Sequence, residues 1–143
     1  MSISTLLFAL GAAISVALAD FILKLSSGRI GTNLVTLIYA FTATVIPTAW
    51  VLWDKFRGAP LTFTREGALL GVLVGIAFSL AVVFFSLTFA AGVNLSIATP
   101  AIRIVAIVLA SALGVLVLRE EFTVRYALGF VLAGAGIYLI VTR

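Results

Sequence analysis

The fold is decided by the stretch from Gly67 to Ile102, GALLGVLVGIAFSLAVVFFSLTFAAGVNLSIATPAI, in which none of the 36 residues carries a charge. A helix that crosses a lipid bilayer needs about 20 mostly apolar residues. The stretch is therefore long enough for one membrane-spanning helix, a tight turn and the start of a second helix. We expect the turn at Gly92 and the N-cap of the second helix at Asn94.

Apolar segments of similar length flank this stretch, so the sequence predicts an all-α integral membrane bundle of five transmembrane helices. The expected helices cover residues 4–25, 32–53, 67–90, 94–118 and 124–142. Gly58 and Pro60 should end the second helix, whereas Thr64 and Thr123 should cap the third and the fifth. Because no linker or low-complexity tract interrupts the chain, we expect residues 1–143 to form a single membrane domain.

The composition supports lipid as the main solvent. Of the 143 residues, 64% are hydrophobic and 10% charged, whereas a soluble domain is about half apolar and a quarter charged. The net charge of +4 is typical of basic residues that flank membrane segments, not of a nucleic-acid partner. The absence of His and Cys excludes disulfides, thiol nucleophiles, imidazole bases and His/Cys metal sites. We therefore expect no cofactor or metal and no enzyme, with carboxylate chemistry as the alternative that this composition leaves open. The expected location is the cell membrane, as a multi-pass protein of a bacterial or archaeal inner membrane.

The basic residues give little information about orientation. Five of them are expected on the side of the N-terminus, namely Lys55, Arg57, Arg65, Arg119 and Arg125. Three are expected on the other side, namely Lys24, Arg29 and Arg143. This bias is weak by the positive-inside rule, so the chain is a candidate for insertion in both orientations. The first 19 residues resemble a signal peptide. No Lys or Arg precedes their apolar run, however, and Lys24 and Arg29 follow it, so we expect the segment to be retained.

Charges inside the predicted helices are the main candidates for function, because each costs roughly 2.5–3.5 kcal/mol on insertion scales. Asp20 and Arg103 lie within helices, and Lys24 lies at a helix border. Asp20 should lie about 7 Å and Arg103 about 13 Å from helix ends on the same side, so the two could pair. Lys24, one turn from Asp20, is an alternative partner. We interpret these three residues as a substrate or proton site; the alternative is a structural ion pair, with Lys24 reaching the lipid headgroups.

Pro100 lies three residues before Arg103 and cannot donate the backbone hydrogen bond that would reach Ser96. An irregular helix beside a charge is typical of transporter sites, although proline also occurs in membrane helices without that role. Aromatic side chains suit organic or cationic ligands, although contact with lipid is the alternative for the phenylalanines. The candidates for lining a cavity are Tyr39, Phe78, Phe85, Ser96 and Pro100.

Two short motifs resemble known membrane proteins. The segment Leu118-Arg119-Glu120-Glu121-Phe122-Thr123 lies between a Pro-containing helix and a Gly/Ala-rich one. This order resembles the closing segment of an EamA repeat, the five-helix unit of the drug/metabolite transporter superfamily, with Glu120 at the acidic position of that family. The segment Lys24-Leu25-Ser26-Ser27-Gly28 is similar to the Lys-x-Ser-x-Gly stretch of the small multidrug resistance branch.

The resemblance implies transport of a small organic metabolite or drug-like compound by alternating access. Typical members have two inverted repeats and this chain has one, so it also implies an antiparallel homodimer with the substrate at the midplane between the halves. The small multidrug resistance branch carries a proton- and drug-binding glutamate eight residues before the lysine. That position is Val16 here, so this role does not carry over, and Asp20 lies one turn further along. The alternative is a non-transporting partner or structural subunit that completes another transporter or flippase.

Overall fold

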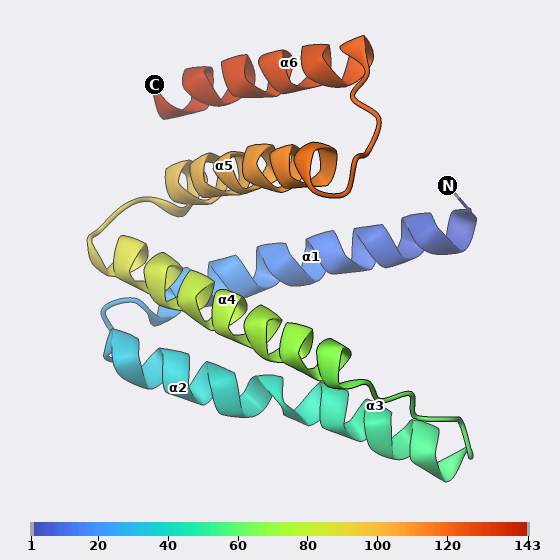
Figure 1. The fold of residues 1–143 in the computed structure, drawn as a ribbon. Coiled ribbons are helices and arrows are strands. Elements are labelled where there is room, and N and C mark those ends of the chain that lie inside the picture. The colour runs from blue at the N-terminus through green and yellow to red at the C-terminus, as the bar shows by residue number, and fades with distance from the viewer. Residues whose placement is uncertain (1, 143) are drawn as a thin grey trace. The chain divides into compact units, whose positions relative to one another are not determined.

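A computed structural model describes residues 2–142, and this part of the chain is helical with no strand (Figure 1). The helices are α1 (Ile3–Ser26), α2 (Thr32–Ala43), α3 (Val45–Phe56), α4 (Arg65–Ala90), α5 (Leu95–Leu116) and α6 (Val124–Val141). The predicted all-α class is confirmed for residues 2–142. The helices form two compact units, Met1–Gly92 with α1 to α4 and Val93–Arg143 with α5 and α6. A single membrane domain stays a prediction.

Within the described residues, four helical segments are long and apolar enough to cross a membrane. They are α1, α2 together with α3 (Thr32–Phe56), α4 and α5. Helix α6 also contains an apolar segment, Val124–Leu139, within the residues whose side chains the structure describes. Several long apolar helices are consistent with a multi-pass membrane protein.

The second expected helix, residues 32–53, lies within one apolar segment, Thr32–Phe56, that is long enough to cross a membrane. The expected helix is not continuous, however. Its place is taken by α2 and α3, which meet at Thr44. Pro47 has no N–H to donate to the Ala43 carbonyl, and its ring crowds that carbonyl. The Thr44 N–H donates to the Phe41 carbonyl, three residues earlier, at 3.3 Å. The helical i to i−4 pattern begins again where the Thr48 N–H donates to the Thr44 carbonyl at 3.1 Å. Pro47 therefore interrupts the span, a signal that the sequence interpretation did not use.

The predicted helix ends agree with the structure at most positions. The Thr64 hydroxyl accepts a hydrogen bond from the Gly67 N–H, and the Thr123 hydroxyl accepts one from the Tyr126 N–H. Gly92 turns the chain with a φ of +88°, which only glycine adopts without strain. Asn94 is the N-cap residue of α5, as expected, although its side chain makes no capping hydrogen bond.

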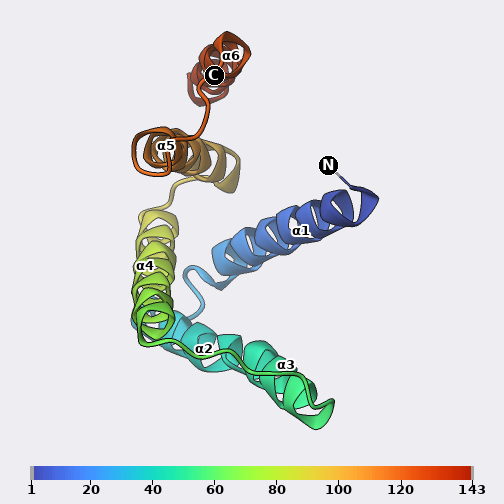
Figure 2. The ribbon, with the colours of Figure 1, turned by 45° about the vertical axis from the view of Figure 1, so that its right-hand side comes forward.

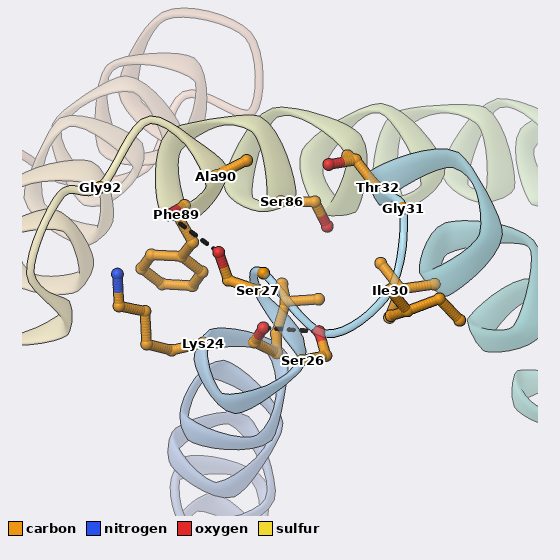
Figure 3. A pocket seen from close by; sticks show the side chains of 13 residues that line it. Lys24, Ser26, Ser27, Ile30, Gly31, Thr32, Ser86, Phe89, Ala90 and Gly92 are labelled. Carbon is orange, nitrogen blue, oxygen red and sulfur yellow. Dashed lines mark hydrogen bonds between the residues drawn. The ribbon is translucent and has the colours of Figure 1, made fainter.

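The first unit brings three helix ends together. Helix α4 packs along α2, and α1 contacts α4 (Figure 1; Figure 2). The chain leaves α1 and enters α2 through a short loop that lies beside the end of α4 (Figure 3). The first unit forms a cavity at this corner. In the second unit, α5 and α6 pack as an antiparallel pair (Figure 1).

Most of the large apolar side chains in the described residues are exposed, and few side chains are buried. In α1 the one buried side chain is that of Asp20, whereas Ile3, Leu7 and Phe8 are exposed. In α4 the buried side chains are Phe85, Ser86 and Phe89. Apolar side chains that face outward suit lipid, because hydrocarbon tails solvate them as well as a protein core does.

Candidate functional site

A cavity of about 430 Å³ lies in the first unit where α1 ends, α2 begins and α4 ends (Figure 3). Its walls include Lys24, Ser26 and Ser27 from the end of α1 and the segment after it, and Ser86 and Phe89 from α4. The volume falls within the range of about 300–1,000 Å³ that small-molecule sites occupy. The Lys-x-Ser-x-Gly stretch singled out in the sequence thus forms one wall of the cavity.

Two contacts fasten this wall to α4. The Ser27 hydroxyl donates a hydrogen bond of 3.0 Å to the Phe89 carbonyl (Figure 3). The Lys24 Nζ lies 5.4 Å from the centroid of the Phe89 ring, within the range of a cation–π interaction. Phe89 is in turn packed against Phe85, with ring centroids 5.8 Å apart. The lysine is therefore held at the cavity by an aromatic ring from another helix.

The carbonyl groups at this corner are already used by the protein. The Ser26 hydroxyl donates to the Leu23 carbonyl at 2.7 Å, and the Arg29 N–H donates to the Ser26 carbonyl at 3.0 Å. At the end of α4, the Phe89 carbonyl also accepts from the Gly92 N–H at 3.1 Å. These bonds occupy acceptors at the negative ends of α1 and α4.

The start of α2 presents donors instead. The N-cap position is Gly31, which has no side chain to cap the helix. The N–H groups of Leu34 and Val35 donate to the Gly31 carbonyl, which leaves the amides of Thr32 and Asn33 at the open end of the helix. Gly31 and Thr32 line the cavity. A helix N-terminus of this kind carries a partial positive charge and favours anions.

Ser86 supplies the most unusual polar group of the cavity. Its side chain is 5% exposed, and its hydroxyl has no hydrogen-bond partner among the described residues. A buried polar atom without a partner costs about 1–3 kcal/mol. Such an atom on a cavity wall indicates that a further group completes its bonding. The sequence interpretation did not single out Ser86, because one serine in a long apolar helix gives no signal of its own.

The predicted charged site residues of the first unit, Asp20 and Lys24, lie on α1. Lys24 is half-buried and lines the cavity. Asp20 is buried, with 6% of its surface exposed, one helical turn before Lys24 on the same face of α1. Asp20 and Lys24, the alternative pair considered in the sequence, thus lie one turn apart on one side of α1.

Three further predicted site residues lie on α5 in the second unit. Arg103 and Pro100 are half-buried on α5, and Ser96 is exposed near its start. Pro100 lies inside the helix, as expected. The pairing of Asp20 with Arg103 joins residues of different units and stays a prediction.

The aromatic candidates occupy three different environments. Tyr39 lines a second cavity of about 250 Å³ between α2 and α4, together with Asn33 and Ser79. Phe78 is 64% exposed on α4, which favours lipid contact for its ring. Phe85 is buried against Phe89. A cavity-lining role for the two phenylalanines stays a prediction.

In the second unit, the segment that contains Arg119 and Glu120 caps the end of α5. Arg119 adopts a left-handed φ of +56°, and the Glu120 N–H then donates to the Gly114 carbonyl at 3.1 Å. A Cβ at Gly114 would lie 2.5 Å from the Glu120 Oε2, so the glycine makes room for this carboxylate. On α6, the Tyr126 hydroxyl donates to the Ser111 Oγ at 2.7 Å, which joins the two helices.

The chain was compared with protein-family models, with curated proteins and with solved structures, and none of these comparisons gave a match.

Proposed function

We propose that the protein is a membrane transporter that moves a small organic compound by alternating access. The burial of Asp20 is the observation that carries this proposal. Asp20 is the one buried side chain of α1, a helix whose length and composition suit a membrane span. An ionisable residue inside a membrane helix is expensive and marks a substrate or ion pathway by default. In the first unit, Asp20 is the proposed substrate- or proton-binding residue, with Lys24 one helical turn away on α1. In the second unit, Arg103 on α5 is the proposed substrate-binding residue.

Two interrupted or proline-containing helices support a moving mechanism. Pro47 separates α2 from α3, and Pro100 lies inside α5. Transporters of many folds use discontinuous helices at their sites, because a break exposes backbone groups and lets the segments change angle. The resemblance of the chain to a single EamA repeat agrees with this mechanism.

The proposed assembly is an antiparallel homodimer. One five-helix repeat is half of the usual inverted pair, and the balance of basic residues gives little preference for one orientation. Apolar side chains along α6 are exposed, among them Leu128, Val131 and Leu132. Helix α6 also carries Gly129, Gly134 and Gly136, small residues that allow close approach of another membrane helix.

Reconstitution of the purified chain in liposomes tests this function. Wild type should move a compound from a panel of small metabolites and drug-like cations under a proton or concentration gradient. Asp20→Asn should abolish that flux, and Glu66→Gln, which alters an exposed carboxylate at the start of α4, should keep it. Folded wild type that moves nothing across the panel would favour the alternative, a non-transporting partner or structural subunit.

A further inference from the structure

We propose that the cavity at the corner of α1, α2 and α4 binds a phosphate group, carried by the headgroup of an anionic lipid. The inference does not depend on transport, since it concerns only what this cavity recognises. Three independent walls present groups that suit an oxyanion: the cation of Lys24, the N-terminus of α2 and the hydroxyl of Ser86.

Lys24 supplies the charge. It is the one basic residue among the residues that line the cavity, and its ammonium is a compact charge of the kind that phosphate sites use. The Phe89 ring holds the ammonium at the cavity. From residue 1 to residue 53, the charged side chains are Lys24, Arg29 and Asp20, so this part of the chain carries a net positive charge.

The N-terminus of α2 supplies backbone donors. Gly31 cannot cap the helix with a side chain, so an external acceptor is needed for the amides of the first turn. The competing negative ends of α1 and α4 are weakened, because Ser26, Ser27 and the loop amides already donate to their carbonyls. The partial positive charge at the start of α2 therefore outweighs the partial negative charges at the ends of α1 and α4, and this corner favours an anion.

The buried Ser86 hydroxyl, which has no hydrogen-bond partner among the described residues, is the observation that indicates a bound group in this cavity. A serine or threonine inside a helix usually donates to the carbonyl four residues earlier. Thr88 does so on the same helix, with 2.8 Å to the Phe84 carbonyl. Ser86 makes no such bond, and Figure 3 shows its hydroxyl directed from α4 toward the α1–α2 loop. A phosphate oxygen in the cavity would accept that proton.

The position along the helices indicates a lipid as the source of the phosphate. The cavity lies at the ends of three apolar helices, and Lys24 belongs to the last turn of α1. Basic residues at the ends of membrane helices lie at the depth of the lipid headgroups, where phosphates are abundant. A volume of about 430 Å³ leaves room for a phosphate with part of its glycerol.

The test is a thermal-shift titration of the full chain in a maltoside detergent, which contains no phosphate. Three probes are compared: dioctanoyl phosphatidic acid, dioctanoylglycerol and inorganic phosphate. We expect saturable stabilisation by phosphatidic acid and none by dioctanoylglycerol, which has the same chains without the phosphate. Inorganic phosphate that stabilises as strongly as the lipid would keep the phosphate site but overturn the lipid source. No stabilisation by either phosphate probe would overturn the proposal.

Two variants locate the effect at this cavity. Ser86→Ala and Lys24→Gln should each weaken phosphatidic acid binding by about fivefold or more, as expected when a hydrogen bond to a charged group is lost. The matched controls are Thr88→Val, a hydroxyl whose bond stays within α4, and Lys55→Gln, a lysine outside the cavity. Equal binding by Ser86→Ala and Thr88→Val would contradict the assignment even if Lys24→Gln failed to fold.

Discussion

The hydroxyl of Ser27, just after the last residue of α1, donates a hydrogen bond of 3.0 Å to the carbonyl of Phe89 on α4. This bond joins positions 62 residues apart. It positions the loop between α1 and α2 against the end of α4, and with it one wall of the cavity that contains Lys24 and Ser86. The Ser27 side chain, within the Lys-x-Ser-x-Gly stretch, thus helps to hold the α1–α2 loop against α4 in the first unit.

Ser27→Ala should lower the stability of the first unit. Loss of one hydrogen bond costs about 1 kcal/mol, so the thermal unfolding midpoint in detergent should fall by a few degrees. Ser15→Ala is the matched control, because the Ser15 hydroxyl donates within its own helix to the Gly11 carbonyl. An equal fall for both variants would mean that the Ser27–Phe89 bond has no special role in joining the helices.

Pro47→Ala should close the break between α2 and α3. The alanine restores an N–H that can donate to the Ala43 carbonyl, so hydrogen exchange of the amides around Thr44 should slow by about fivefold. Pro60→Ala, in the loop after α3, should leave that exchange unchanged. Exchange around Thr44 that remains as fast in Pro47→Ala would show that the break has another cause.

Tyr126→Phe should loosen the contact between α5 and α6. The change removes the hydrogen bond of 2.7 Å to the Ser111 Oγ and keeps the ring, which contacts Phe122 and Phe130 edge to face. We expect a loss of about 0.5–1.5 kcal/mol in unfolding free energy. Tyr138→Phe, at an exposed position of α6, should have no comparable effect, and equal losses would argue against a structural hydrogen bond.

Arg103→Ala should change the substrate preference of the proposed transport. If the guanidinium contacts the substrate, uptake of an anionic or zwitterionic compound should fall more than uptake of a cation, because Arg binds carboxylates and phosphates through paired hydrogen bonds. Competition between labelled compounds in proteoliposomes measures the ratio. An equal loss for all compounds would assign Arg103 a structural role.

An inverted pair predicts that the N-terminus is found on both sides of the membrane. The chain has no cysteine, so a single cysteine at Ser2 reports orientation without background. We expect an impermeant maleimide to label comparable fractions of this cysteine from either side of the membrane. Labelling from one side only would exclude an antiparallel homodimer and leave a parallel or heteromeric assembly.

Apolar length was a sufficient guide to where the helices lie, because a bilayer dictates a minimum run of apolar residues. The caps at Thr64 and Thr123 and the turn at Gly92 were also predictable, since each depends on local backbone chemistry. The interruption at Thr44 was missed because hydropathy does not register Pro47. A hydropathy pattern averages over such a residue, whereas the hydrogen-bond ladder does not.

The cavity was only partly predictable. Lys24 and Asp20 were evident as charges in apolar surroundings. Ser86 and the α2 N-terminus were not, because their importance comes from three helix ends that meet in space. The Ser27–Phe89 bond that holds these ends together connects distant parts of the chain, and no local pattern indicates it.

The most direct test of the transport mechanism is the pH dependence of flux in proteoliposomes, measured for wild type and for Asp20→Asn. Asp20 is a buried carboxylate of α1, a helix long and apolar enough to cross a membrane. If Asp20 carries the proton in the proposed transport, wild-type flux varies with pH and any flux remaining in Asp20→Asn does not. Asp20→Glu should restore the pH dependence. If Asp20→Asn kept the full wild-type flux and the same pH profile, the proposed role of Asp20 in transport would be wrong.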